Sequence, residues 1–360
     1  AGIVPNMPET VAAALAVAAL GAVWASCSPD FGADAICDRL SQIEPKILFA
    51  ADGYSYHGKI FDIREKLRIV TESLPTVEKT VVWPHVLQPE DLDGIPKAEP
   101  LESFLAGHPP GEISFVRTGF REPLYILFSS GTTGMPKSII HSAGGAILQH
   151  MKEHQLHADL RPGDRMFFYT TCGWMMWNWL ISGLGSEAAI VLFDGNPFYP
   201  GVSRLFDLAE SERLTHFGVS AKFIETCLKR GIQPRRGHDL SSLLTVLSTG
   251  SPLSGECYGH VYRDWSDDVF LASICGGTDI LGAFIGGCPV KPVHRGEIQC
   301  AQLGLDMDVF DENGHSIFGK PGELVCKNAH PSMPIGFARD PQGKRYHASY
   351  FGVYDNVWRQ

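Results

Sequence analysis

The sequence lacks any C-x-x-C pair, and its nine cysteines follow no regular spacing. Zinc ribbons and disulfide scaffolds depend on such patterns, so neither class of protein is indicated. Isolated thiols are typical of proteins in a reducing compartment. The cysteines therefore favour a cytoplasmic protein.

Clusters of basic residues are also missing. The chain has 30 Lys and Arg against 40 Asp and Glu, which gives a formal net charge of -10. A nucleic-acid surface needs concentrated positive charge, so such a partner is disfavoured, although a local field can still hold a nucleotide. Small molecules are the expected partners, and the sequence leaves the oligomeric state open.

A hydrophobic run long enough for a membrane span is absent as well. The apolar stretch from Val11 to Val23 is too short, and no basic segment precedes it as in a signal peptide. We interpret it as a buried, alanine-rich helix and expect no membrane attachment. The chain enters this helix almost at once, without an initiating methionine, so we expect that an N-terminal portion precedes it.

What is present is a long α/β pattern. The 360 residues, 44% of them apolar, suffice for a large core and two or more subdomains. Short apolar runs alternate with helical patterns, which predicts parallel sheets with helices on both faces. The expected strands are 46–50, 79–83, 124–128, 165–171, 189–193, 216–219, 243–248 and 269–274. The expected helices are 11–24, 61–67, 142–157, 174–184, 202–214, 221–229 and 254–265.

Two regions break this alternation. Residues 84–118 are rich in Pro, Gly and acidic residues, and they predict a long surface connection. Beyond about Gly287 the apolar segments shorten, and Asn313-Gly314 is a hairpin signal, so a small antiparallel barrel or sheet is expected. The expected units are two α/β subdomains at 1–118 and 119–286 and a small β-rich subdomain at 287–360.

The most informative stretch is 129–137, which reads Ser-Ser-Gly-Thr-Thr-Gly-Met-Pro-Lys directly after an apolar run. Its glycines permit backbone geometries in which successive N–H groups face an anion, and its hydroxyls add donors. The residues are Ser130, Gly131, Thr132, Thr133 and Gly134. A Walker A loop would need Gly-Lys followed by Ser or Thr, and Pro136 separates the glycine from Lys137, so a P-loop phosphotransferase is disfavoured.

Two more polar loops, at 249–252 and 275–279, follow expected strands. Because ligands collect beyond the carboxyl ends of parallel strands, we expect all three loops to converge on one crevice.

The loop at 129–137 resembles the phosphate-binding signature of the acyl-adenylate-forming superfamily, which includes acyl-CoA synthetases, luciferases and peptide-synthetase adenylation domains. Further motifs extend the resemblance over essentially the whole chain and to one branch, the enzymes that join acetoacetate to coenzyme A. They are Ser-Pro-Asp-Phe-Gly at 28–32, His-Ser-Ala-Gly-Gly at 141–145, Gly-Trp-Met-Met-Trp-Asn-Trp at 173–179, Ser-Thr-Gly-Ser-Pro at 248–252, Gly-Gly-Thr-Asp at 276–279 and Gly-Glu-Leu-Val at 322–325. The implied fold is the incomplete N-terminal α/β domain of this superfamily.

The resemblance implies a two-step ligase reaction. A carboxylate and ATP give acyl-AMP and pyrophosphate, and the thiol of CoA then displaces AMP. The implied catalytic residues are Lys137 on the β- and γ-phosphates, Thr278 on the α-phosphate and Asp279, in place of the usual glutamate, as a Mg²⁺ ligand. The implied cofactor-binding residues are Ser130, Gly131, Thr132, Thr133, Gly134 and Gly277 around the phosphates, Gly250, Ser251 and Pro252 at the adenine, and Phe31 and Gly32 at CoA. Acetyl-CoA synthetases carry a glutamate at the position of Ser251.

The acyl pocket is expected beside Gly276, where acetyl-CoA synthetases have a closing tryptophan. Hydrogen in place of an indole opens room for a four-carbon acid such as acetoacetate, with Trp174 and Met175 as the opposite wall. We interpret Trp177 and Trp179 as core. The absence of this tryptophan does not determine the polarity of the pocket, so butyrate or 3-hydroxybutyrate stays an alternative substrate.

One motif lies outside this scheme. His150-Met151-Lys152-Glu153-His154 matches the H-x-x-E-H pattern of some zinc peptidases, and His157 extends the same helical face. The sequence marks no third ligand and no carbonyl-polarising cleft. We therefore interpret the histidines as solvated side chains of a polar helix rather than as a zinc site.

The resemblance stops at both ends. Residues 350–360 look like the approach to a Gly-Asp motif whose aspartate binds the ATP ribose, but that motif, the hinge and the mobile lid domain with its lysine are not in the sequence. We expect that these 360 residues alone neither activate acetoacetate efficiently nor transfer it to CoA. A non-catalytic nucleotide-binding module is the alternative from another class, and the retained Lys137, Thr278 and Asp279 argue against it.

Overall fold

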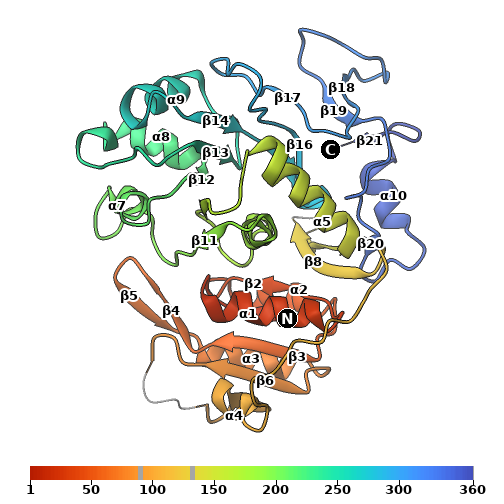
Figure 1. Ribbon diagram of the computed structural model, residues 1–360. Coiled ribbons are helices and arrows are strands. Elements are labelled where there is room, and N and C mark those ends of the chain that lie inside the picture. Colours follow the sequence, from red (N-terminus) through yellow and green to blue (C-terminus); the bar gives the residue numbers. More distant parts are fainter. Residues whose placement is uncertain (88–91, 130–133, 360) are drawn as a thin grey trace.

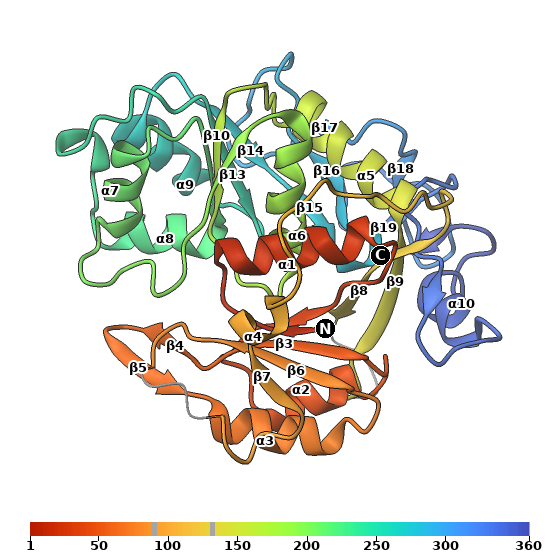
Figure 2. The ribbon, with the colours of Figure 1, turned by 60° about the horizontal axis from the view of Figure 1, so that its bottom comes forward.

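The structure is a computed structural model that describes residues 1–87, 92–129 and 134–359. Two five-stranded parallel sheets form its main part (Figure 1). Their strand orders are β2-β1-β3-β6-β7 and β11-β10-β12-β13-β14. Helices lie on both faces of each sheet (Figure 2), so the predicted α/β architecture is confirmed.

The first sheet is built from short strands near the N-terminus. They are β1 (Gly2–Ile3), β2 (Ser26–Cys27), β3 (Ile47–Ala51), β6 (Lys79–Trp83) and β7 (Ala98–Pro100). Helices α2 (Ala33–Leu40) and α3 (Arg64–Ser73) bury Ile36, Leu67 and Val70 against one face. Helix α1 (Pro8–Ala19) covers the other face and lies between the two sheets (Figure 2).

Some predicted boundaries in this part are wrong. Helix α1 ends at Ala19, and Trp24 instead forms a bridge with Tyr125. Residues at the start of the helix expected at 61–67 belong to an antiparallel hairpin of β4 (Gly53–Tyr56) and β5 (Lys59–Asp62), so α3 begins only at Arg64. The connection expected at 84–118 contains β7 and the short helix α4 (Leu101–Leu105).

The second sheet carries the longer α/β repeat. Its strands are β10 (Arg165–Phe168), β11 (Ala189–Val191), β12 (His216–Ser220), β13 (Thr245–Thr249) and β14 (Phe270–Ser273). Helices α7 (Arg204–Ser211), α8 (Ala221–Lys229) and α9 (Gly255–His260) cover one face, and α5 (Ala143–Lys152) and α6 (Met175–Ser182) lie on the other side.

A serine at the end of β12 shows how a strand passes directly into a helix. The Ser220 hydroxyl accepts a hydrogen bond from the backbone N–H of Phe223 at 3.2 Å and so caps α8. Because β12, β13 and β14 run parallel and in register, the segments that leave their carboxyl ends meet at one edge.

Small antiparallel sheets complete the fold. They are β20-β9-β8, β15-β16-β17 and β18-β19-β21, and helix α10 (Lys344–Tyr350) precedes the last strand. The strands are β8 (Pro123–Ser129), β9 (Lys137–Ser142), β20 (Gly336–Phe337), β15 (Cys275–Gly277), β16 (Gly282–Gly286), β17 (Cys300–Ala301), β18 (Met307–Phe310), β19 (Glu323–Cys326) and β21 (Trp358–Arg359). The sheet formed by β18, β19 and β21 confirms the antiparallel structure expected near the C-terminal end. The turn at Asn313-Gly314 is present, with Gly314 at φ +79°.

Two of the expected loops have a different setting. The glycine-rich stretch joins β8 and β9, which pair antiparallel, so it does not follow a strand of a parallel sheet. Residues 275–277 are the strand β15 rather than a loop. The crevice is therefore formed by the ends of the parallel strands β10, β12, β13 and β14 and by residues of the antiparallel strands β8, β15 and β16.

An apolar cluster joins the two halves of the molecule. Trp24, Trp83, Tyr125 and Trp177 pack together between the sheets with residues of α1. No helix of the described residues has both the length and the apolar character needed to cross a membrane.

Candidate active site

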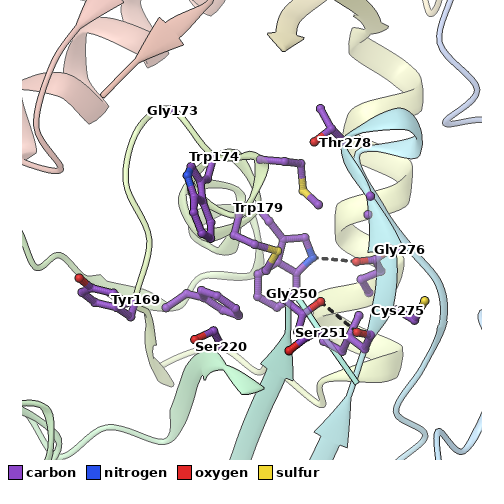
Figure 3. Close-up of a pocket in the computed structure, with 18 of the residues that line it drawn as sticks. Tyr169, Gly173, Trp174, Trp179, Ser220, Gly250, Ser251, Cys275, Gly276 and Thr278 are labelled. Carbon is purple, nitrogen blue, oxygen red and sulfur yellow. Dashed lines mark hydrogen bonds between the residues drawn. The ribbon is translucent and has the colours of Figure 1, made fainter. Parts of the chain in front are cut away.

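A cavity of 520 Å³ opens at the carboxyl ends of the strands of the second sheet (Figure 3). Its lining combines segments that are far apart in the sequence. The lining residues are Phe31, Arg39, Phe128, Glu153, Phe168, Tyr169, Gly173–Met176, Trp179, Ser220, Thr249–Pro252, Ser273–Thr278, Gly282 and Ile298.

Most of the predicted site residues line this cavity. They are Phe31, Trp174, Met175, Gly250, Ser251, Pro252, Gly276, Gly277 and Thr278. Gly32, Lys137 and Asp279 do not line it, but Asp279 directly follows Thr278. Gly134 is exposed, with φ +87°. Ser130, Gly131, Thr132 and Thr133 lie outside the described residues.

The end of the cavity formed by 249–252 has a defined backbone. Gly250 adopts φ +87°, a left-handed conformation that glycine reaches without strain, and the chain turns there directly after β13. The Thr249 hydroxyl donates to the carbonyl of Ile274 at 2.9 Å. This bond links the second predicted polar loop to the segment that leads into the third.

Beside the cavity, Lys137 and Asp279 form a partly buried ion pair. Lys137 Nζ lies 2.7 Å from Asp279 Oδ1, and the two side chains are 22% and 15% exposed. Lys137 is the first residue of β9, and Asp279 lies in the short 3-10 helix Thr278–Ile280. The pair therefore joins the glycine-rich stretch to the Gly-Gly-Thr-Asp motif.

Tyr350 is part of the same cluster, although it was not among the predicted site residues. Its hydroxyl donates to Asp279 Oδ1 at 2.5 Å, and its ring centroid is 5.1 Å from Lys137 Nζ. Burial, and next the neighbouring Asp279 carboxylate, raise the pKa of Tyr350, so the phenol keeps its proton as a donor. The ring stacks on Trp358 at 3.7 Å. Sequence position alone gives no signal for this contact across 71 residues.

Another part of the cavity lining is aromatic and apolar. Trp174 is 58% exposed (Figure 3), and Met175 follows it as the first residue of α6. Trp177 is fully buried and donates to Asn6 Oδ1 at 3.0 Å, which confirms its core role. Trp179 is also buried, but it lines the cavity as well. It is therefore both a core residue and a cavity residue.

Gly276 was expected to open room for the acid, but in the structure the lack of a side chain has a different effect. A Cβ on this backbone would lie 2.0 Å from the carbonyl oxygen of Gly282 and 2.4 Å from Ala283 Cα. A side chain at Gly276 would thus run into β16 rather than into the cavity. The glycine allows β15 to approach β16 closely, and the wall is formed by this pair of strands.

The H-x-x-E-H helix is buried, so the expectation of solvated histidines is wrong. His150, His154 and His157 are at most 6% exposed, and each ring bonds a backbone carbonyl: those of Leu281, Trp179 and Gly287. Burial lowers the pKa of His150 to about 4 and that of His154 well below its usual value. Tertiary packing around α5 removes this face from water.

The same motif contains a cavity residue that was not predicted from the sequence. Glu153 is 4% exposed and lines the cavity next to Trp179. The described residues contain no group of three or more His, Cys, Asp or Glu side chains that could hold a metal ion. The H-x-x-E-H pattern alone does not show that this helix is buried. The sequence therefore provides no reason to expect a carboxylate that faces the cavity.

Comparison with known proteins identifies the family of the chain. Residues 1–333 match the family model of the AMP-binding enzymes, and the chain belongs to that family. Within it, the chain is a homologue of acetoacetyl-CoA synthetases. It is 52% identical to the acetoacetyl-coenzyme A synthetase of Rhizobium meliloti (strain 1021), over 99% of this chain and 55% of that protein. It is 44% identical to the acetoacetyl-CoA synthetase of Danio rerio, over 99% of this chain and 54% of that protein.

A solved structure of such an enzyme has the same fold. The acetoacetyl-CoA synthetase from Streptomyces lividans matches with a TM-score of 0.94 at 44% identity, covering 100% of this chain and 55% of that one. The chain thus spans about half the length of the curated relatives and of the solved structure that it matches.

Proposed function

We propose that the protein containing this chain is an acid-thiol ligase, which activates acetoacetate with ATP and transfers it to coenzyme A. The supporting observation is that one cavity is lined by the segment 250–252, by Thr278 and by the aromatic start of α6. A nucleotide and a short acid can therefore meet in a single cavity. A site for nucleotide binding alone would not need the aromatic end.

In the first step, a carboxylate oxygen of the acid attacks the α-phosphorus of ATP, and the bond to the bridging oxygen breaks to release pyrophosphate. The residues beside Gly250 receive the adenine, and Thr278 donates to the α-phosphate. Lys137 exchanges the Asp279 carboxylate for phosphate oxygens. Holding the two reactants in line and balancing the charge is the main demand of this step.

In the second step, the thiol sulfur of CoA attacks the acyl carbon, a thioester forms, and AMP leaves. Phe31, which lines the cavity, is the proposed contact for the adenine of CoA, together with Gly32. Both follow the Ser-Pro-Asp stretch at 28–30. The apolar lining limits access of water, which would otherwise hydrolyse the adenylate.

Mg²⁺ fits the proposed site through Asp279. This carboxylate is next to Thr278 and already neutralises a cation, Lys137. Mg²⁺ typically uses one or two carboxylates and completes its coordination with phosphate oxygens and water, so a lone aspartate suffices. When bound, the ion would offset the negative charge of the phosphates.

The test is acetoacetate-dependent pyrophosphate release by the full product of the gene that encodes this chain. Butyrate and 3-hydroxybutyrate are the comparison substrates, because they share the chain length of acetoacetate. Titration of the 360-residue chain with ATP tests the nucleotide site separately. Binding of ATP without release of pyrophosphate with any of the three acids would favour a non-catalytic nucleotide-binding role instead.

A further inference from the structure

Glu153 is a buried carboxylate in the part of the cavity beside Trp179 and Gly276, which we call the acyl end because the proposed acid would lie there. It is the first residue of the π-helical turn Glu153–His157 that continues α5, and π-helical turns are frequent at functional sites. Its side chain lines the cavity together with Trp179, Gly276 and Gly282. The proposed activation step gives this residue no role, although a buried carboxylate is costly and needs a reason.

Three hydrogen-bond donors surround the Glu153 carboxylate. Oε1 accepts from Gln149 Nε2 at 2.6 Å and from the backbone N–H of Ala283 at 2.7 Å. Oε2 accepts from Trp179 Nε1 at 2.8 Å (Figure 3). An ionised carboxylate only accepts hydrogen bonds and can take all three, so these donors favour the ionised form. Burial raises the pKa of Glu153, and the neighbouring Lys152 ammonium and the three hydrogen bonds oppose this effect.

Glu153 also connects the two walls of the acyl end. Trp179 lies on α6, and Ala283 lies on β16 opposite Gly276 of β15. A Cβ on Gly282 would come within 2.4 Å of Glu153 Oε1, so the carboxylate reaches β16 only because residue 282 is glycine. The position of the charge is therefore fixed by both walls.

We propose that Glu153 is a specificity-determining residue that sets which charge the far end of a bound acid can carry. The proposal rests on the proposed function, because it assumes that the acid lies with its reacting carboxylate toward Thr278 and its tail toward Glu153. A fixed negative charge in a water-poor cavity repels an anionic tail strongly. The site thus accepts short acids with an uncharged tail and rejects dicarboxylic acids of equal length.

A series of four-carbon acids tests this directly. Butyrate has a neutral tail, succinate an anionic tail and 4-aminobutyrate a cationic tail. Their dissociation constants are measured by calorimetry on the full product of the gene that encodes this chain, saturated with a non-hydrolysable ATP analogue. In the wild-type chain, succinate is expected to bind at least about tenfold more weakly than butyrate.

The Glu153→Gln variant keeps the side-chain volume and removes the charge. It is expected to strengthen succinate binding relative to butyrate about tenfold and to weaken 4-aminobutyrate relative to butyrate. A purely structural role would move all three acids in the same direction. The matched control is Glu112→Gln, at an exposed position of the connection after α4, which should leave the three ratios unchanged.

Three results would overturn the proposal: succinate binding as tightly as butyrate in the wild-type chain, unchanged ratios in Glu153→Gln, or a parallel loss for all three acids. If Glu153→Gln does not fold, Trp179→Phe replaces it. That variant removes one donor but keeps the charge, so rejection of succinate should persist, and its loss would contradict the proposal. Failure of all the acids to bind the wild-type chain would contradict the proposed function itself.

Discussion

Lys137 and Asp279 are 142 residues apart in the sequence, yet the ammonium nitrogen lies 2.7 Å from the carboxylate oxygen Oδ1. The pair holds the strand that follows the glycine-rich stretch against the end of β15. In the absence of phosphate, it neutralises both charges in a partly buried place. The proposed nucleotide must therefore replace one partner of an existing ion pair.

Replacing Lys137 with Ala is expected to weaken ATP binding by at least about tenfold, because the phosphates lose a charge-assisted donor. Calorimetric titration of the chain with ATP measures the effect. Lys222→Ala, in an exposed ion pair with Glu225, is the control and should leave the affinity unchanged. Equal affinities of Lys137→Ala and the wild-type chain would rule out Lys137 as a phosphate contact.

Tyr350→Phe is expected to lower the free energy of unfolding by about 1.5–3 kcal/mol, the usual range for a bond to a charged group. The variant removes the hydroxyl that donates to Asp279 Oδ1 and keeps the ring on Trp358. Tyr354→Phe is the matched control, because the Tyr354 hydroxyl donates to a neutral carbonyl, that of Asp311. Urea unfolding of both variants should show the larger loss for Tyr350→Phe, and the reverse order would contradict the prediction.

Gly276→Ala should destabilise the protein by at least about 2 kcal/mol, because the new methyl group overlaps the backbone of β16. Gly259→Ala provides the comparison: Gly259 lies in α9, and a Cβ there meets nothing within 4 Å. That change should be neutral or stabilising, since alanine favours a helix over glycine. Thermal unfolding of the two variants tests this prediction. A Gly276→Ala variant as stable as the wild type would show that β15 and β16 can move apart with little loss of stability.

Stability is expected to fall as the pH drops from about 6.5 toward 4. Burial lowers the pKa of His141, His150 and His330 to about 4 in the folded protein. Because the pKa of these histidines is lower in the folded protein, the unfolded chain binds protons first as the pH falls. Keeping the buried histidines neutral therefore costs no stability above the unfolded pKa. Stability is lost progressively as the pH falls from the unfolded pKa to the folded pKa. When the folded and unfolded pKa of one histidine differ by about 1, the difference corresponds to about 1.4 kcal/mol of stability.

Urea unfolding at about pH 7 and pH 5 measures this loss. The variant His150→Gln keeps a donor for the Leu281 carbonyl and should lose less stability between the two pH values. His315→Gln, whose side chain is 78% exposed in the wild type, should behave like the unchanged protein. Equal stability of the wild-type protein at both pH values would contradict the expected titration.

Elements with strong local signals could be predicted from the sequence. Strand β6 and helix α8 occur at the predicted residues, because an apolar run or a serine cap defines their limits. Most of the predicted binding residues line one cavity, since they follow neighbouring strands of a parallel sheet.

Features that depend on distant partners could not be predicted. Strand β9 pairs with β20, almost 200 residues later, and no local pattern marks it. Burial of His154 and Glu153 depends on packing of α5 against α6 and β16. The polar sequence of this helix therefore wrongly indicates an exposed face. The role of Gly276 depends on the carbonyl of Gly282, which only the register of β15 on β16 reveals.

This cavity is proposed to serve the activation of acetoacetate by ATP. The most direct measurement is acetoacetate-dependent exchange of labelled pyrophosphate into ATP by the full product of the gene. We predict exchange with acetoacetate that exceeds exchange with butyrate and 3-hydroxybutyrate and that Lys137→Ala abolishes. Exchange with none of the three acids, or equal exchange in Lys137→Ala, would contradict the claim.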